Sequence, residues 1–373
     1  MVAYIIRRVV QAIPVLLLIA VVSFSLMMMA PGGPQSQFNQ NPRITEEQIN
    51  TYLARWCLER HPSPEGILRT FGGWIGVWNC EGTEGLGGFF SAQGRPNFLP
   101  GFVGGGDNGL LHLDFGRSMI VSPDQPVLDL IIFRLPATLI LMTTAFLIWV
   151  SLAIVLGVIA AVKRYSLFDQ SVTLMSYIFY SLPTFWLGLM LIYIFAVNLN
   201  LLPAQGIVSV RDSPAPFNTE RYWEAFWQDP WPQIQDIAQH LVLPVITLVA
   251  VSVAADTRYV RSAMLDVLGQ DYVRTARAKG LPSRVVLFRH AFRNALLPII
   301  TNIALALAFL FSGAIVTETI FSWPGMGRLY FEAILARDYY LVMGILFVSA
   351  ALVVLMNLVA DVVYAWADPR IRY

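Results

Sequence analysis

Long runs without a charged residue alternate along this chain with shorter polar segments. Val9–Ala30, Pro136–Val162 and Ser171–Asn200 carry no charge. A helix of about 20 apolar residues is long enough to cross a hydrocarbon core of about 30 Å. Three further segments meet the same requirement: His240–Ala255 with its flanks, Ile299–Thr317 and Tyr340–Ala360. The pattern predicts an all-α membrane protein with six transmembrane helices.

The only sizeable polar region lies between the first and second predicted helices. Residues 31–135 hold 17 of the 26 glycines, which is typical of turns and loops. We expect a loop-rich insertion on the outer face, with a glycine-rich stretch at 79–108. Both cysteines, Cys57 and Cys80, fall here. In an oxidising compartment this pair predicts a disulfide, worth about 3 kcal/mol on the chain-entropy argument.

The distribution of basic residues predicts the orientation. Of the 25 lysines and arginines, 14 fall in segments on one side of the predicted spans, and both lysines, Lys163 and Lys279, are among them. Positive residues are retained on the cytoplasmic side, so both termini are expected there. The predicted domains are a cytoplasmic N-terminus with the first helix (1–30), the outer insertion (31–135), a five-helix core (136–365) with a cytoplasmic loop at 257–297, and a cytoplasmic tail (366–373).

One cytoplasmic stretch, Asp271–Pro298, carries six basic residues against a single acid. Asp271 suits the N-terminus of a short helix, either by capping free N–H groups or by facing the positive end of the helix dipole. Gly280 supplies a left-handed turn at the C-terminus of that helix, and Pro282 stops its continuation. A second helix is predicted from near Ser283 to Pro298. We call this predicted two-helix unit, residues 271–298, the basic knob.

The composition excludes several classes of protein. The chain is 56% hydrophobic and 13% charged, against about 25% charged residues in soluble domains. Its net charge of +1 gives no indication of nucleic-acid binding. Neither lysine lies in a Gly-Lys-Ser/Thr nucleotide loop, and the four histidines show no paired metal spacing. We therefore expect no catalytic residue, metal or cofactor in this chain, and a partner that supplies the energy for any transport.

Two motifs resemble the permease subunits of ABC importers in their dipeptide/oligopeptide form. The first runs from Ala276 to Gly280 (Ala-Arg-Ala-Lys-Gly) and is followed by Pro298 eighteen positions after the glycine. In that family this loop forms the coupling helix, which sits in a groove of the cytoplasmic ATPase. The general importer motif begins Glu-Ala-Ala, whereas Arg274-Thr275-Ala276 stands here. The expected coupling residues are Asp271, Arg274, Thr275, Ala276, Arg277, Ala278, Lys279, Gly280 and Arg284.

The second motif, Val316–Gly327, resembles the peptide-permease stretch after the fifth helix, and it continues to Arg337-Asp338-Tyr339. Pro324 and the nearby glycines predict a turn at the outer interface. Glu318 is either a helix-end carboxylate that faces water, or a residue with a role in the outer gate or in binding peptide amines. The candidate residues for this gate and substrate path are Glu318, Trp323, Pro324 and Gly325. Arg337 and Asp338 are expected to form a local ion pair.

The resemblance implies the ABC importer permease fold and a transport subunit of the plasma or inner membrane of a bacterium or archaeon, which is not an enzyme. The implied partners are a second homologous permease, two cytoplasmic ATPases that hold ATP and Mg²⁺, and an external binding protein. The implied cargo is a dipeptide or oligopeptide. Nickel chelates or glutathione-like solutes remain alternative cargoes, and a passive channel or a receptor remains an alternative class.

Overall fold

The computed structural model describes residues 2–29, 67, 71, 114–118, 120–123, 125–211, 213–308 and 313–367. These residues are mostly helical, and an isolated antiparallel bridge joins Arg117 to Pro126. The chain divides into two compact units, which we describe separately. The first unit comprises Met1–Val9, Arg134–Arg328 and Leu352–Tyr373, and the second comprises Val10–Phe133 and Leu329–Ala351.

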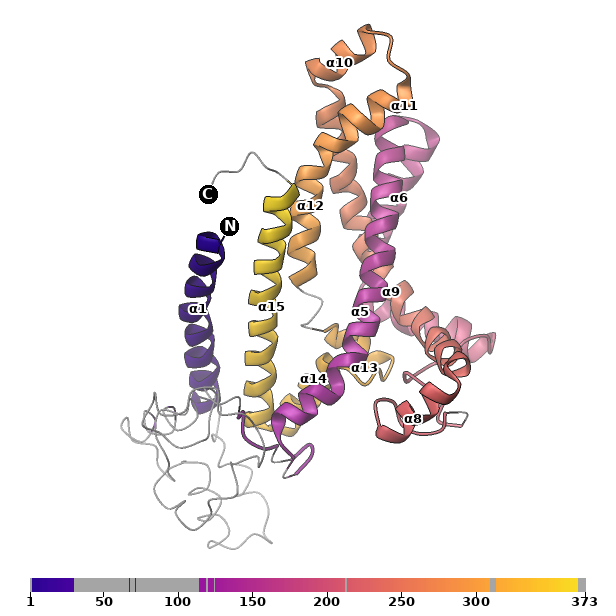
Figure 1. The fold of residues 1–373 in the computed structure, drawn as a ribbon. Coiled ribbons are helices and arrows are strands. Elements are labelled where there is room, and N and C mark those ends of the chain that lie inside the picture. The colour runs from indigo at the N-terminus through magenta and orange to yellow at the C-terminus, as the bar shows by residue number, and fades with distance from the viewer. Residues whose placement is uncertain are drawn as a thin grey trace, which may run out of the picture. The chain divides into compact units, whose positions relative to one another are not determined.

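The described helices follow one another from α1 to α15 (Figure 1). Two of them, η2 and η3, are π-helical segments that continue α7 and α11. Their bounds are α1 Val2–Met29, α5 Val127–Val162, α6 Leu167–Ser181, α7 Thr184–Leu191, η2 Ile192–Asn198, α8 Glu220–Gln228, α9 Pro230–Leu268, α10 Asp271–Ala278, α11 Ser283–Val285, η3 Val286–Phe292, α12 Arg293–Ala308, α13 Ile315–Ile320, α14 Met326–Ala336 and α15 Tyr339–Ala367.

Four described helices are long and apolar enough to cross a membrane, or five spans if the bent pair α6 and α7–η2 forms one of them. The four are α1, α5, α9 and α15, and they coincide with the first, second, fourth and sixth predicted spans. The fifth predicted span, Ile299–Thr317, lies partly outside the described residues, because α12 ends at Ala308. The count of six therefore stays a prediction, as does the insertion at 31–135, most of which is also outside the described residues.

The third predicted span, Ser171–Asn200, is wrong as a single straight helix. Helix α6 ends at Ser181, and the following helix, α7 with η2, is bent away by 98°. The break falls at Leu182, whose backbone is extended (φ −78°, ψ 130°). Pro183 explains this conformation, because its ring clashes with an α-helical backbone at the preceding residue.

Two other helices extend beyond their predicted ends through a proline. Helix α5 begins at Val127 rather than Pro136, so its first turns contain residues that were assigned to the insertion. The second helix of the basic knob does not stop at Pro298, which lies inside α12. Membrane helices tolerate proline, because adjusted turns and neighbouring groups satisfy the backbone groups that the proline leaves free. A π-helical turn, η3, directly precedes α12.

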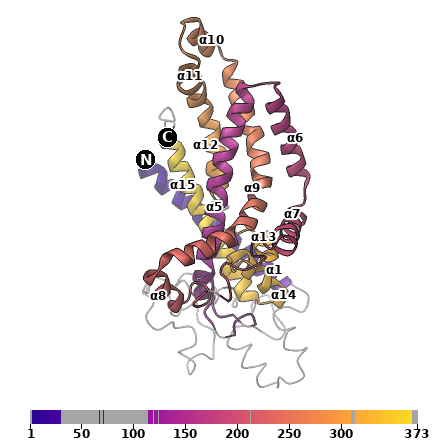
Figure 2. The ribbon, with the colours of Figure 1, turned by 90° about the vertical axis from the view of Figure 1, so that its right-hand side faces the viewer.

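In the first unit, α9 packs on α5, α6 and α12 (Figures 1 and 2). Gly157 of α5 allows a close approach to α9, since a Cβ atom at this position would lie 2.7 Å from Val260 Cβ. Asp256 of α9 accepts hydrogen bonds from the Trp149 indole of α5 (2.8 Å) and the Asn302 amide of α12 (3.0 Å). These contacts make α5, α9 and α12 one packed body, with α10 at one end and α8 and α13 at the other.

Candidate functional site

The basic knob forms a compact turn between α9 and α12. Helix α10 begins directly after Gln270 and ends at a left-handed Gly280 with φ +72°. The Gly280 N–H donates to the Arg277 carbonyl over 2.9 Å, and the Lys279 N–H donates to the Thr275 carbonyl over 3.0 Å. Only glycine adopts a positive φ without a steric cost, so the residue type sets the direction in which the chain leaves α10.

The inner side of the knob is apolar and is held by α9. Val273 and Ala276 of α10 are buried against Met264 of α9, together with Val286 and Ala291 of η3. Ala276 was expected among the coupling residues, but its side chain faces this cluster. Its coupling role stays a prediction. An alanine suits the position because a larger side chain would push α10 away from η3.

The outer side of the knob is exposed and strongly basic. Asp271 lies in the first turn of α10, next to the N-cap residue Gln270, and therefore at the positive end of the helix dipole. Its carboxylate pairs with Arg274 at 3.4 Å, but both side chains are largely in solvent (96% and 72% exposed), so the pair contributes little to stability. The other expected coupling residues with exposed positions are Thr275, Arg277, Ala278, Lys279, Gly280 and Arg284.

Sequence reasoning missed three exposed apolar side chains of the knob. Tyr272, Leu281 and Phe288 are exposed, and Phe288 stands 60% in solvent with its ring 6.4 Å from that of Phe292. The sequence signal that could have identified them is the presence of large apolar residues within an otherwise polar loop. Interfaces characteristically place aromatic side chains at their centre and charged residues at their rim, and the exposed residues of the knob include both types.

The second candidate site, around Glu318, is a buried turn rather than an exposed helix end. The Glu318 side chain is 0% exposed, so it does not face water. Its Oε1 accepts from the Thr138 hydroxyl of α5 (3.0 Å) and from the Ala314 N–H (3.3 Å). Its Oε2 accepts from the Arg328 N–H at the start of α14 (2.9 Å). The carboxylate thus satisfies N–H groups that a helix N-terminus leaves free, and negative charge is favoured there.

The remaining gate candidates complete the same turn. Trp323 is fully buried and donates its indole N–H to the Ala137 carbonyl of α5 over 2.8 Å. Thr138, which sequence reasoning did not single out, accepts from the Met326 N–H over 2.7 Å. Gly325 is required by space, because a Cβ atom there would lie 2.5 Å from Glu318 Oε2 and from Thr138 Oγ1. Pro324 is partly buried between these residues.

The acid of the Arg337–Asp338 pair has partners of its own in the second unit. Asp338 is fully buried, and its Oδ2 accepts from the Ser118 hydroxyl (2.6 Å) and from the Ile120 N–H (2.9 Å). Asp338 therefore anchors the segment before α5 to the start of α15. A carboxylate at a helix start and a serine in a short turn are both common, so nothing in the sequence indicated their contact.

The remaining site predictions stay predictions. Cys57 and Cys80 lie outside the described residues, so their disulfide stays a prediction. Within the described part of the chain, no group of three or more His, Cys, Asp or Glu side chains is arranged to hold a metal ion.

Comparison with known proteins adds family information to this geometry. Residues 153–373 match the family described as binding-protein-dependent transport system inner membrane component. The chain is 38% identical to the oligopeptide transport system permease protein AppB of Bacillus subtilis, over the full length of both chains. It is 35% identical to the dipeptide transport system permease protein DppB of Escherichia coli K12, over 100% of this chain and 99% of the relative. A putative peptide transport system permease protein of Brucella abortus is 34% identical over the full length of both chains.

The family match covers more than half of the chain, and it includes α9, the basic knob and the turn at Glu318. The full-length relatives are permease subunits of transporters, so the chain is a transport subunit and not an enzyme. This chain therefore belongs to the family of binding-protein-dependent transport system inner membrane components.

Proposed function

We propose that this chain is one of two permease subunits in an ATP-driven importer of dipeptides or oligopeptides. The relatives named for oligopeptide and dipeptide transport support the cargo class. The observation that carries the proposal is the basic knob, a rigid, exposed and positively charged surface at the end of α9. The chain transmits force and forms half of the path, while ATP and Mg²⁺ are bound by partner subunits.

The knob has two properties that a docking helix requires: a fixed inner side and an exposed, charged outer side. Its inner side is fixed to α9 and η3 by buried apolar contacts, so a push on α10 moves the packed body rather than the knob alone. The knob also exposes Arg274, Arg277, Lys279 and Arg284, together with Tyr272 and Leu281. We propose that this surface enters a groove with acidic side chains on each cytoplasmic ATPase partner. Closure of two ATPases on ATP would then bring the knobs of two permeases together and favour one state of the pair.

A second homologous permease would complete the path. A largely apolar groove of about 560 Å³ lies between α5, α6 and α9. Its few polar positions include Ser171, Ser176 and Thr257. An apolar wall with a few hydroxyl groups suits cargo of varied side chains, because hydroxyls hydrogen-bond weakly and without charge preference. We propose that the wall formed by these helices contributes to the path.

The buried turn around Glu318 is proposed as the outer gate. It lies at the end of the first unit opposite to α10 (Figures 1 and 2). The Glu318 carboxylate fixes the start of α14 to α5, so its hydrogen bonds determine whether this turn stays closed. An external binding protein would deliver peptide on this side, where we also place residues 31–135. The knob and both termini are proposed to lie in the cytoplasm.

The test is purification of the chain together with candidate ATPase subunits from the same organism, followed by peptide uptake in vesicles. Arg277→Glu together with Lys279→Glu should remove the ATPases from the purified complex, because the reversed charges repel an acidic groove. Arg221→Glu, an exposed change on α8 at the other end of the first unit, is the matched control and should retain them. ATPase binding unaffected by the knob variant would overturn the proposed docking.

A further inference from the structure

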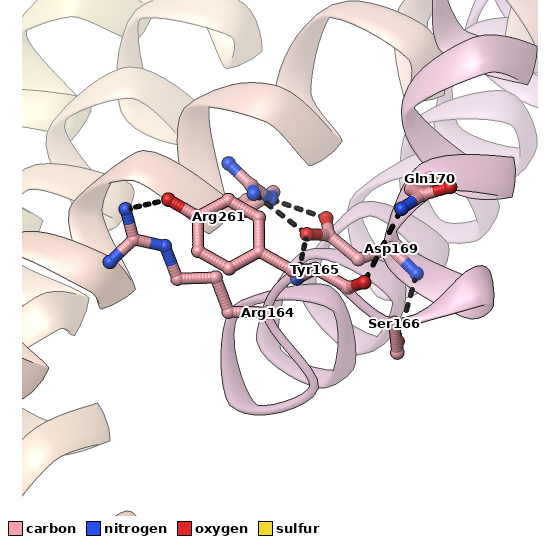
Figure 3. A network of polar contacts seen from close by, with 6 residues as sticks. All are labelled: Arg164, Tyr165, Ser166, Asp169, Gln170 and Arg261. Atoms are coloured by element: carbon pink, nitrogen blue, oxygen red, sulfur yellow. Dashed lines mark hydrogen bonds and ion pairs between the residues drawn. The ribbon is translucent and has the colours of Figure 1, made fainter.

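A second polar connection lies near the knob, between α6 and α9. Arg261 of α9 donates from Nε to Asp169 Oδ1 (2.6 Å) and from a terminal nitrogen to Asp169 Oδ2 (2.8 Å), as Figure 3 shows. This bidentate geometry is the strongest form of an arginine–carboxylate contact. Asp169 is only 3% exposed, so water does not compete effectively for its oxygens. We call the pair Asp169–Arg261 the clamp.

The same carboxylate fixes the turn between α5 and α6. The Tyr165 N–H donates to Asp169 Oδ2 over 2.9 Å, and the Asp169 N–H donates to the Ser166 hydroxyl over 3.3 Å (Figure 3). Tyr165 has a positive φ of 64°, which is unfavourable for a residue with a side chain. The carboxylate therefore holds a strained turn and α9 at the same time, so neither can move without the other.

On the α9 side, the clamp is part of the body that carries the knob. Val260 and Met264, on either side of Arg261 in sequence, are buried with Val273 and Ala276 of α10. Only Gly269 and Gln270 separate α9 from α10. A displacement of the knob therefore reaches Arg261 through packed side chains, with no long linker to absorb it.

On the α6 side, the clamp is connected through α6 and α7 to the buried turn around Glu318. The apolar groove lies between α5, α6 and α9, so the contacts of α6 with both neighbouring helices are incomplete along this face, although α6 still packs on α9. Beyond Pro183, α7 packs on α13, and a Cβ atom on Gly188 would lie 3.2 Å from the Phe321 ring. Phe321 follows α13, which contains Glu318. Helix α6 thus joins the clamp at one end to the proposed outer gate at the other.

We propose that Asp169 and Arg261 are positioning residues that make α6 follow the knob, and thereby transmit the state of the ATPases to the outer gate. The effect on transport rests on the proposed function, whereas the role of the clamp in joining α6 to α9 does not. Without the clamp, α9 and the knob would still move with the ATPases, whereas α6 and α7 would follow this displacement only in part. Hydrolysis would then continue with less peptide moved per ATP.

The first test measures amide hydrogen exchange in α6 by mass spectrometry, on the purified chain in lipid nanodiscs. Asp169→Asn should increase exchange across Leu167–Ser181 by about tenfold or more, because a charged bidentate contact is lost. Asp361→Asn is the matched control: it makes the same chemical change in the exposed Arg8–Asp361 pair (3.1 Å) and should leave α6 unchanged. Unchanged exchange in the Asp169 variant would overturn the clamp.

The second test measures peptide uptake per ATP hydrolysed in the reconstituted complex. Asp169→Asn should lower this ratio by about fivefold or more with the ATPases still bound, a split that simple loss of folded protein does not produce. Should that variant fail to assemble, Arg261→Lys, which keeps the charge and removes the bidentate geometry, decides by the same ratio. A wild-type ratio would overturn the coupling role, whereas absent uptake in the wild-type complex would instead overturn the proposed function.

Discussion

At the scale of single residues, Gly280 and Glu318 show two different ways in which one side chain fixes a backbone. Gly280 fixes the backbone because it has no side chain. Its φ is +72°, and no atom beyond its two chain neighbours lies within 4 Å of an added Cβ. The restriction there is conformational and not steric crowding. Glu318 fixes the backbone through hydrogen bonds, since its carboxylate accepts them from α5 and from both ends of the buried turn.

Gly280→Val should disrupt coupling, because a β-branched residue in a left-handed conformation costs at least about 1–2 kcal/mol and favours another path out of α10. The expected result is loss of bound ATPases or of peptide-stimulated ATP hydrolysis, measured on the reconstituted complex. Gly269→Ala is the control, because Gly269 has an ordinary φ of −79° and its nearest contacts are at 3.7 Å. Normal stimulated hydrolysis in the Gly280 variant would contradict the role of this turn.

Glu318→Gln should weaken the buried turn, because an amide replaces one acceptor oxygen with a donor that then faces N–H groups. A buried donor left without an acceptor costs about 1–3 kcal/mol. We expect peptide uptake to fall while ATPase coupling is largely kept, as measured in vesicles containing the complex. The exposed Glu224 of α8 offers the control substitution Glu224→Gln. Uptake that is the same in both variants and the wild type would exclude Glu318 from the gate.

At the scale of helices, close packing decides which elements move together. The α5–α9 contact depends on Gly157, whose position leaves only 2.7 Å between an added Cβ and Val260, and 2.9 Å to the Thr257 carbonyl. The carbonyl belongs to the backbone of α9 and cannot rotate away. Helices in membranes commonly approach through small residues in this way, because packing and hydrogen bonding replace the hydrophobic effect there.

Gly157→Ala should therefore force α5 and α9 apart and destabilise the purified chain by about 1–3 kcal/mol, the usual cost of overpacking. The measurement is the midpoint of thermal unfolding in detergent. Val155→Leu changes side-chain volume in the same helix at a position that is 53% exposed, and it should leave the midpoint unchanged. Equal midpoints for both variants would show that the α5–α9 contact is less tight than described.

At the scale of the whole molecule, orientation links the elements to their partners. The distribution of basic residues predicts that the knob lies in the cytoplasm, and α8 lies at the opposite end of the first unit (Figures 1 and 2). The family match confirms the resemblance to importer permeases and a multi-pass membrane protein, while the side on which each terminus lies stays a prediction.

Labelling with a membrane-impermeant thiol reagent tests that orientation. Lys279→Cys should react only after the cells are permeabilised, because the knob is predicted to be cytoplasmic. Trp227→Cys, on α8 and 78% exposed in the wild-type side chain, should react in intact cells. The unsubstituted chain gives the background from Cys57 and Cys80. Reaction of Lys279→Cys in intact cells would reverse the topology and remove the docking surface from the ATPases.

The sequence alone determined the features that depend on neighbours along the chain. Uncharged runs predicted the long helices α1, α5, α9 and α15, since helix length and bilayer thickness are matched locally. Gly280 and Pro282 predicted the turn of the knob, because the conformational limits of a residue act within one or two positions. The absence of a nucleotide loop and the two motifs predicted the transport family before any packing was known.

Only the tertiary structure decided which distant residues meet. Glu318 and Thr138 are 180 positions apart, and Asp169 and Arg261 are 92 apart, so no local pattern indicated either contact. The inward position of Ala276 likewise depends on packing against α9 and η3. A charge or a proline in the sequence shows that a special position exists, but its partner is chosen by the fold, because burial and hydrogen bonding act through space.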